Sequence, residues 1–411
     1  MPEKDRFEAL YGEDHPRQMK RAETMIGDFE KHFGSRPAAL ITAPGRSEII
    51  GNHTDHQNGR VVAAAIDADI MAAVSPRDDM KVTIYSSGFA GFSLDISDVS
   101  PVKTEAYTSS ALVRGIAAAV RAKGLQARGF DAVMESQVDV GSGLSSSAAF
   151  ENLIGGIFSH LFNDGAVSEV DTALMSRYSE NNYFMKPCGL EDQLASALGG
   201  ISFIDFRESL SPSFEALKTD FEHFGHTLVI TNAGASHADL TDDYAAITSE
   251  MYAVAGFFGR SALREVDPSE FYGNLSVLRK KFGDRAILRA HHFFEEDQRP
   301  SKAIACLKNG DFGGFLSLLN ESGLSSSLYL QNIYSASSPS SQSLGVALMQ
   351  AKRLLGGRGS ARVHGGGFAG TIACLVPSDE TDRFIKEMDA LFGAGSARVY
   401  RIRKYGVFRL F

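Results

Sequence analysis

The feature that most constrains this chain is a strand-like segment, a glycine- and serine-rich loop and a helix-like segment in direct succession. The pattern predicts a strand in GFDAVMESQVDV at 129–140, a loop in GSGLSSS at 141–147 and a helix in AAFENLIGGIFSHLF at 148–162. A helix that begins after such a loop presents free N–H groups and the positive end of its dipole to an anion. The alternative is a serine-rich turn that only caps the helix.

The hexapeptide SGLSSS of this loop, Ser142–Ser147, recurs at Ser322–Ser327 in a different setting. The second copy follows the helical run DFGGFLSLLNES, so that Gly323 stands where a helix would end, and the segment after it is interrupted by Pro339. Because the C-terminal end of a helix repels anions, we expect a cap and a turn at the second copy. A phosphate site is expected only at the first copy.

Composition limits the class of protein. The chain has 411 residues with 44% hydrophobic content, enough for a sizeable core and two domains. A net charge of −9 disfavours non-specific nucleic-acid binding, and no run approaches the roughly 18 apolar residues of a membrane span. Three cysteines (Cys188, Cys306 and Cys374) have neither disulfide-framework nor zinc-site spacing. We expect a cytoplasmic protein without nucleic-acid or membrane partners. A monomer is expected, and an oligomer is the alternative.

Strand and helix patterns alternate irregularly, which favours an α+β fold over a doubly wound parallel sheet. Helices are expected near the N-terminus and over 110–124, and the strand AALITAPGR is expected to end in a turn at Pro44-Gly45. The pattern changes near GGISFIDFRESLSPSFEALK. This change predicts a domain transition near residue 205, with domains 1–205 and 206–411.

The segment APGRSEIIGNHTDHQNG at 43–59 gathers polar side chains between strand-like segments. Such a cluster suits a polyhydroxylated ligand, because each sugar hydroxyl needs a hydrogen-bond donor or acceptor. The His/Asp/His spacing also allows a metal site, and a solvated turn is a third interpretation. The polar residues of this segment are Arg46, Glu48, Asn52, His53, Asp55 and His56.

Two further segments contain candidate functional groups. In MKPCGLEDQLASALGG at 185–200, Asp192 stands at the start of a helix-like run, either as a carboxylate favoured by the helix dipole or as a general base. In VHGGGFAGTIACLV at 363–376, Gly365, Gly366 and Gly367 precede a strand. Backbone there either passes close to a ligand or belongs to a tightly packed strand.

In order and spacing these segments resemble the galactokinases of the GHMP small-molecule kinase family over almost the full chain. The three family motifs correspond to APGRSEIIGNHTDH, GSGLSSSAAFE and GGGFAGTIACLV, and PCGLEDQ is similar to the catalytic segment. ITNAGASHADLTDDY resembles the stretch that ends in a sugar-contacting tyrosine, here Tyr244. The resemblance implies the two-domain GHMP kinase fold, with the active site in the cleft between the domains.

The resemblance also implies an activity: phosphorylation of the anomeric (C1) hydroxyl of galactose by ATP and Mg²⁺, giving galactose 1-phosphate and ADP. Asp192 would lie against that hydroxyl, and Arg46 would bridge toward Asp192 and the γ-phosphate. The third-motif glycines would close over the site. The sugar-binding positions match Arg46, Asn52, His53, Asp55, Gly189, Asp192 and Tyr244. The ATP phosphate site matches Gly141, Ser142, Gly143, Leu144, Ser145, Ser146, Ser147 and Ala148, and the implied magnesium ligands are Ser147 and Glu180, a solvated helix-face glutamate being the alternative for Glu180.

The chain departs from the family pattern in the first motif and before the phosphate loop. Galactokinases usually have Arg-x-Asn…Gly-Glu-His-x-Asp-Tyr, whereas this chain has Glu48, Asn52 and His56, so that Asn and Glu are exchanged. Asp139 replaces a proline before the loop. An ionised carboxylate only accepts hydrogen bonds, whereas an amide also donates, so substrate preference is open to a related sugar, N-acetylgalactosamine or arabinose. A non-catalytic, galactokinase-like sugar sensor is the alternative from a different class.

Overall fold

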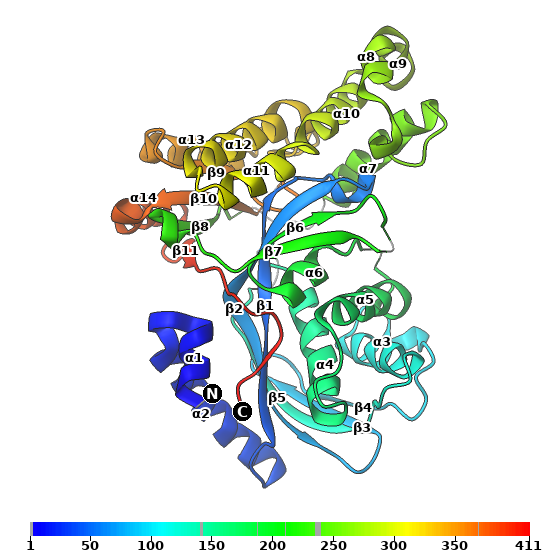
Figure 1. The fold of residues 1–411 in the computed structure, drawn as a ribbon, viewed down its shortest axis with the longest axis vertical. Helices are drawn as coiled ribbons and strands as arrows, with labels where there is room; N and C mark the ends of the chain where they lie inside the picture. Colours follow the sequence, from blue (N-terminus) through cyan, green and yellow to red (C-terminus); the bar gives the residue numbers. More distant parts are fainter. Residues whose placement is uncertain (1–2, 140–142, 187, 210, 235–239, 369) are drawn as a thin grey trace.

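The computed structural model describes residues 3–139, 143–186, 188–209, 211–234, 240–368 and 370–411. Two β-sheets form its frame, and helices pack on both of them (Figure 1). The α+β class expected from the sequence is confirmed. In the described part of the chain, no helix combines the length and the apolar character needed to cross a bilayer.

The larger sheet has eight strands in the order β12-β1-β2-β5-β3-β4, with β6 paired to β2 and β7 paired to β6. Among the described pairings, β3 and β5 run parallel and the other neighbours run antiparallel. β2 is apolar and buried along nearly its whole length because helices cover both faces of the sheet at that strand. The strands are β1 (Ala39–Ile50), β2 (Arg60–Pro76), β3 (Lys81–Ser86), β4 (Phe92–Asp95), β5 (Phe130–Ser136), β6 (Ile201–Asp205), β7 (Ser213–Leu217) and β12 (Phe408–Arg409).

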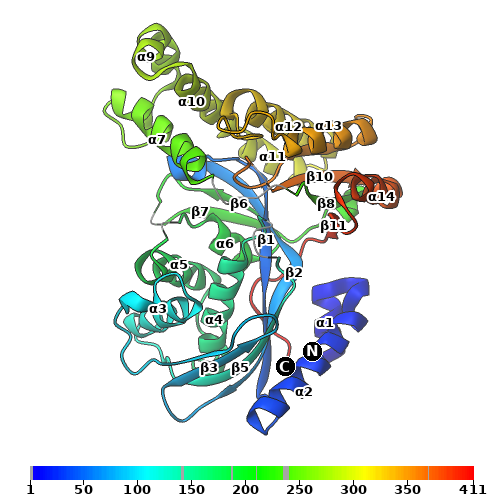
Figure 2. The same ribbon diagram turned by 180° about the vertical axis from the view of Figure 1, so that it is seen from behind.

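The first six α-helices enclose this sheet. Helices α3 to α6 cover one face, and α1 and α2 cover the other (Figures 1 and 2). Helix α2 ends at Gly34, whose left-handed backbone (φ 72°) allows its N–H to donate to the Glu30 carbonyl. The helices are α1 (Glu3–Tyr11), α2 (His15–Phe33), α3 (Ser109–Ala122), α4 (Ser146–Phe162), α5 (Glu169–Ser179) and α6 (Glu191–Leu198).

The smaller sheet has the strand order β11-β8-β10-β9 and is antiparallel throughout its described pairings. Helices α13 and α14 pack on it, and the long connection from β8 to β9 is mostly helical. The strands are β8 (His226–Asn232), β9 (Ser360–Val363), β10 (Thr371–Pro377) and β11 (Ala397–Tyr400). The helices are α7 (Thr241–Phe257), α8 (Pro268–Gly273), α9 (Leu275–Phe282), α10 (Asp284–Glu296), α11 (Arg299–Lys308), α12 (Phe312–Ser325), α13 (Ser343–Leu355) and α14 (Thr381–Phe392).

One of the apolar clusters of the core is shared by the two halves. The largest cluster joins residues of β1, β2, α3 and α4 to residues of α11, α12, β8 and β10. Beyond residue 205, β7 pairs with β6, and β12 returns to pair with β1, with Ile41 opposite Arg409. The division into domains 1–205 and 206–411 stays a prediction. Two short strands after residue 205, β7 and β12, belong to the larger sheet, whose other strands end at or before that residue.

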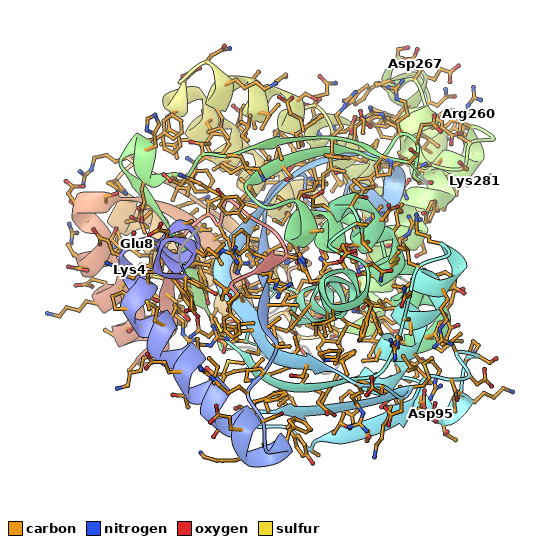
Figure 3. All side chains as sticks on the ribbon, turned by 60° about the horizontal axis from the view of Figure 1, so that its bottom comes forward. Lys4, Glu8, Asp95, Arg260, Asp267 and Lys281 are labelled. Atoms are coloured by element: carbon orange, nitrogen blue, oxygen red, sulfur yellow. The ribbon has the colours of Figure 1, made fainter. Side chains whose placement is uncertain are left out.

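Charged side chains mark the outer surface of the molecule. Figure 3 labels Lys4 and Glu8 on α1, and Arg260, Asp267 and Lys281 at the far end of the α7–α9 region. Lys4 and Glu8 stand one helical turn apart and form a half-exposed surface ion pair, with the charged atoms 3.5 Å from each other. Each such pair contributes only about 0.3–0.5 kcal/mol to the free energy of unfolding. The larger contributions to stability therefore come from the core and from buried polar groups.

The turn expected at Pro44-Gly45 is wrong, because β1 continues through both residues. The register against β2 shifts between Pro44 and Arg46, so the strand absorbs them as an irregularity of the ladder. A Cβ on Gly45 would lie 2.9 Å from the carbonyl oxygen of Leu144 in the glycine/serine loop. Gly45 therefore serves a close approach of loop to strand rather than a turn.

The cap and turn expected at the second SGLSSS copy are also wrong. Helix α12 continues through Gly323 to Ser325 and is followed by a π-helical turn, Ser326–Leu330, which ends at left-handed Gln331. A Cβ on Gly323 would lie 2.9 Å from Cβ of Arg362 in β9. The glycine lets α12 pack closely on β9. A glycine required by this long-range contact looks in the sequence like a glycine that ends a helix.

A buried ion-pair network joins α2, β2 and the C-terminal segment. The Asp69 carboxylate is fully buried and meets Arg21 Nη1 at 2.7 Å and Arg403 Nη1 at 2.8 Å. The Tyr11 hydroxyl donates to Asp69 at 2.5 Å, and the Thr42 hydroxyl donates to the same oxygen. Arg21 has a second partner in Glu135, 3.1 Å from its Nε, so Arg403 depends more on Asp69 than Arg21 does.

We expect Asp69→Asn to lower the free energy of unfolding by about 3–5 kcal/mol, because it leaves the buried Arg403 without its counter-charge and leaves Arg21 with Glu135 alone. Urea denaturation of the purified protein measures the change. Asp28→Asn, which breaks the exposed Lys31–Asp28 pair, is the matched control and should cost no more than about 0.5 kcal/mol. Similar losses in the two variants would contradict this role for Asp69.

Candidate active site

The glycine/serine loop leads into α4 as expected. Gly143 and Ser145 both have left-handed backbone, with φ of 75° and 57°, and α4 begins at Ser146. The Arg46 amide donates to the Leu144 carbonyl at 3.0 Å, which fixes the loop against β1. The first-turn N–H groups of α4, at 146–148, have no intrahelical partner and form the anion-binding end of the helix. Of the expected phosphate-site residues, Gly141 and Ser142 lie outside the described residues.

The two expected catalytic residues form an ion pair at this loop. Arg46, in β1, approaches Oδ1 of Asp192 with Nε at 2.8 Å and Nη2 at 2.7 Å. The Ser145 hydroxyl donates to the other carboxylate oxygen at 2.6 Å, and Arg46 Nη1 donates to the Gly143 carbonyl. The start of α6, the strand β1 and the phosphate loop therefore hold one charged pair in common.

The surroundings keep this pair ionised. Burial by itself would raise the pKa of Asp192, but the positive charge of Arg46 and the hydrogen bond from Ser145 outweigh it and lower the pKa. Burial likewise opposes the charge on Arg46, whose pKa is nevertheless raised by the carboxylates of Asp192 and Glu191. Asp192 is thus a carboxylate with two oriented acceptor oxygens at neutral pH.

The polar turn after β1 places His53 and Asp55 beside the residues from the later motifs. His53 has left-handed backbone (φ 60°), and its Nε2 lies 2.9 Å from the Gly366 carbonyl oxygen. Asp55 begins a short 3₁₀ helix, and a Cβ on Gly189 would lie 3.0 Å from its Oδ2. Burial raises the pKa of Asp55, while His53 opposes the rise. The structure thus brings together three of the expected sugar-site positions.

The third motif packs directly on Tyr244 of α7. The Tyr244 hydroxyl donates to the Gly367 carbonyl at 2.8 Å, and a Cβ on Gly366 would lie 2.5 Å from the tyrosine ring. Burial raises the pKa of Tyr244 to about 12, so the phenol stays neutral and can donate. Gly366 is thus needed for the contact with Tyr244, Gly367 lies against Asn332, and Gly365 has left-handed backbone (φ 64°) with space around it.

Asn52 lies beneath the other residues of the site, which leaves its expected contact with a sugar without support. Its side chain is 0% exposed. Its amide nitrogen donates to Glu48 and, at 2.8 Å, to the Gly365 carbonyl, while its amide oxygen accepts from Ser326 and Asn332. Both polar groups of the amide are used within the protein. The two exchanged residues of the family pattern, Glu48 and Asn52, are therefore in direct contact.

Glu180 is 2% exposed, so the alternative of a solvated glutamate is wrong. Its carboxylate accepts from Lys186 at 3.0 Å and from Gln193 at 2.8 Å. Gln193 also donates to Glu151, whose second carboxylate oxygen is buried without a partner in the described residues. Ser147 lies one helical turn before Glu151 on the same side of α4. This set of hard oxygen donors fits Mg²⁺, which takes few protein ligands beside phosphate and water.

The described residues contain no group of three or more His, Cys, Asp or Glu side chains arranged to hold a metal ion. The metal interpretation of the His53/Asp55/His56 spacing therefore has no support. Both ring nitrogens of His56 are buried without a hydrogen-bond partner among the described residues, and burial lowers its pKa to about 3. Asp139 pairs with Arg398 at 2.6 Å, so that its charge is partly neutralised.

Sequence reasoning missed two buried titratable residues. Glu191 precedes Asp192, and its Oε1 is buried without a partner among the described residues; burial and the carboxylates of Glu48 and Asp55 raise its pKa well above the usual value. His364 lies behind the site, with Nε2 3.1 Å from the Ser47 hydroxyl and Nδ1 2.9 Å from the Thr371 hydroxyl. Both residues stand next to quoted motif residues, but nothing in their local pattern distinguishes them.

Two family signatures match the chain: the galactokinase galactose-binding signature over residues 27–76 and the GHMP kinases N-terminal domain over residues 111–200. The galactokinase of Actinobacillus pleuropneumoniae serotype 3 (strain JL03) is 33% identical over 369 residues, covering 89% of this chain and 92% of its own length. The galactokinase of Glaesserella parasuis serovar 5 (strain SH0165) is 32% identical over 366 residues, covering 87% and 90%.

Solved structures share the fold. The crystal structure of Lactococcus lactis galactokinase complexed with galactose has a TM-score of 0.80 at 24% identity, covering 94% of this chain and 99% of that one. Methanococcus jannaschii mevalonate kinase has a TM-score of 0.63 at 16% identity, covering 89% and 97%. The fold is that of the GHMP kinases, a class that uses ATP. Because its relatives exceed 30% identity over most of both chains, the protein belongs to the galactokinase family.

We expect His364 to lower the stability of the folded protein as the pH falls. Burial first, and then the charges of Arg46 and Arg362, lower its pKa from 6.5 to about 3. Below pH 6.5 the unfolded chain therefore takes up a proton that folded His364 cannot, so acid favours unfolding. From about pH 7.5 to about pH 5.5 this group should cost wild type about 1.4 kcal/mol, a loss absent from His364→Asn.

Urea denaturation of both proteins at the two pH values measures this difference. The gap in unfolding free energy between wild type and His364→Asn should narrow by that amount at the lower pH. A gap that stays constant would show that His364 is not held neutral in the fold.

Proposed function

We propose that this protein transfers the γ-phosphoryl group of ATP to the anomeric (C1) hydroxyl of galactose, giving galactose 1-phosphate and ADP. The observation that supports this most strongly is the Arg46–Asp192 ion pair, held by Ser145 at the N-terminal end of α4. One cation, one oriented carboxylate and a row of helix N–H groups meet at one point. Phosphoryl transfer needs this kind of positioning and electrostatic stabilisation.

In the transfer step the C1 oxygen attacks the γ-phosphorus while the bond to the bridging oxygen of ADP breaks. The hydroxyl proton passes to the Asp192 carboxylate. Because Arg46 and Ser145 keep the pKa of Asp192 low, the carboxylate first orients the hydroxyl as a hydrogen-bond acceptor and takes the proton as the new bond forms. Arg46 stabilises the charge that spreads over the transferring group, in the manner of a fixed positive clamp.

The remaining groups suit a polyhydroxylated substrate. His53, Asp55 and Tyr244 offer a ring nitrogen, a carboxylate and a neutral phenol, and Gly189 lies so close to Asp55 that a Cβ there would be 3.0 Å from the carboxylate. His53 and Tyr244 now contact carbonyl groups of the third motif, so a bound sugar would compete with that loop for them. This mixture of donors and acceptors distinguishes a sugar from an apolar acceptor.

Magnesium belongs to the proposal as the ion that neutralises phosphate charge, with Ser147 and Glu180 as its protein ligands. Glu151, whose free carboxylate oxygen lies in the same cluster, is a third candidate for this role. A cytoplasmic location and a monomeric state stay predictions of the sequence.

Two alternatives share the site. A related sugar, N-acetylgalactosamine or arabinose, is the alternative that the departures from the family pattern at Glu48, Asn52 and His56 leave open. A sugar sensor without turnover would need no ion pair at the phosphate loop, and the intact Arg46–Asp192 pair disfavours it. Tight sugar binding without ADP release would support the sensor.

Wild type should therefore release ADP with galactose at a higher kcat/KM than with N-acetylgalactosamine or arabinose in a coupled assay with a panel of sugars. Asp192→Asn should lower kcat by well over tenfold, more than about 1.4 kcal/mol of barrier, while galactose binding measured by calorimetry persists. An Asp192→Asn variant whose kcat falls less than tenfold would contradict the role proposed for this carboxylate. A higher kcat/KM for another sugar would replace galactose as the substrate.

The two SGLSSS copies provide a matched pair of hydroxyl deletions. Ser147→Ala should raise the KM for Mg·ATP about tenfold or more by removing a hydroxyl at the phosphate-binding end of α4. Ser327→Ala is the control, because the Ser327 hydroxyl, in the π-helical turn after α12, donates back to the Gly323 carbonyl at 2.9 Å. Equal effects on the KM for ATP would contradict the distinction between the two copies.

A further inference from the structure

We propose that Glu48 and Asn52 form a buried positioning pair that sets galactose affinity as one coupled unit, without contact with the sugar. The inference rests on the proposed function, because its effect is on the sugar side of the same site. The pair lies at the point where the end of β1, the third motif and the second SGLSSS copy meet.

Glu48 connects β1 to β9. Its Oε1 pairs with Arg362 Nη2 at 2.5 Å, and Arg362 Nη1 donates to the Ile49 carbonyl at 2.6 Å. Arg362 is 2% exposed and Glu48 is 7% exposed, so the charges neutralise each other away from water. A buried guanidinium without its carboxylate would be costly, which fixes the position of Glu48.

Asn52 connects the same carboxylate to the third motif. Its amide nitrogen lies 3.2 and 3.3 Å from the two Glu48 oxygens and 2.8 Å from the Gly365 carbonyl oxygen. Its amide oxygen accepts from Asn332 at 2.8 Å, and Asn332 also donates to the Gly366 carbonyl at 3.1 Å. One amide therefore ties β1 to the glycine loop with both of its polar groups.

The second SGLSSS copy supports the turn around Asn52. Ser326 donates to the Asn52 amide oxygen at 3.2 Å, and Ser322 donates at 2.6 Å to Glu296, whose carboxylate accepts from the Asn52 backbone amide at 3.2 Å. Ser325 contacts His292 at 2.9 Å, and the other His292 nitrogen lies 2.9 Å from the Asn52 carbonyl oxygen. The second copy thus provides hydroxyls that position the sugar motif.

The pair acts on the sugar site through its next neighbours. His53 follows Asn52 directly, and its ring nitrogen meets the Gly366 carbonyl, while Asn52 itself holds the Gly365 carbonyl. A shift of Asn52 would move His53 and this loop together. Among the described residues, no hydrogen bond joins the Arg46–Asp192 pair to the side chain of Glu48 or Asn52. The charge of Glu48 acts on Arg46 through electrostatics alone, so the ATP side should change least.

Charge and volume are conserved when the two residues change places. The pair contributes one negative charge beside Arg362, and the exchange Glu48→Asn/Asn52→Glu keeps that charge and the total number of methylene groups. Cores tolerate such volume-conserving changes better than single ones. Glu48→Asn alone removes the charge, and Asn52→Glu alone places two carboxylates together, so each single change should fail in a different way.

The test is a double-mutant cycle on galactose phosphorylation. Each single variant should raise the KM for galactose about tenfold or more with the KM for ATP within about twofold of wild type, and the double exchange should return the KM for galactose to within about threefold. If the KM for galactose in the double exchange rises by the product of the two single-variant factors, the two residues act independently, and the pairing is overturned. An inactive wild type would instead overturn the proposed function itself.

Ser326→Ala covers the case in which a single charge variant does not fold, because it leaves Arg362 paired. It should raise the KM for galactose about threefold at unchanged KM for ATP, since it removes one hydrogen bond to Asn52. Asp69→Asn is the matched control: a buried carboxylate outside the site, whose loss should lower stability without raising the KM for galactose. An unchanged KM for galactose in Ser326→Ala would overturn the proposal.

Discussion

The ion pair between Arg46 and Asp192 is the interaction on which the functional part of the molecule depends. It joins the middle of β1 to the first turn of α6, and its remaining hydrogen bonds reach Gly143 and Ser145 in the phosphate loop. Arg46 is largely buried and Asp192 partly so. Charges in such a position are stable only when each has its partner and its hydrogen bonds. The fold satisfies this condition by bringing a strand, a loop and a helix start together.

Glycines make this convergence possible at two places. Gly45 lets β1 touch the phosphate loop, and Gly366 lets the third motif touch Tyr244. A side chain at either position would push apart elements that the site needs in contact. Beneath these contacts, Glu48 and Asn52 link the first motif to β9 and to the third motif, so that the two halves of the chain meet through buried polar bonds as well as through the shared core.

The elements with a local cause could be predicted from the sequence. The start of α4, the place of Asp192 on α6 and the end of α2 at Gly34 each follow from nearby residues. The failures have long-range causes. Gly323 resembles a helix stop, but it serves packing on β9, and Asn52 resembles a ligand group, but it is satisfied by residues that are distant in the sequence. No local pattern contains these partners.

The most direct test of the central claim is the identity of the product. Purified protein, galactose, ATP and Mg²⁺ are incubated, and the product is followed by phosphorus and proton NMR. The proposed geometry predicts a sugar phosphate with its phosphorus coupled to the C1 proton, formed in step with ADP and lost in Asp192→Asn. Phosphate on a different hydroxyl, or ADP without any sugar phosphate, would contradict the assignment of Arg46 and Asp192 to the transfer at C1.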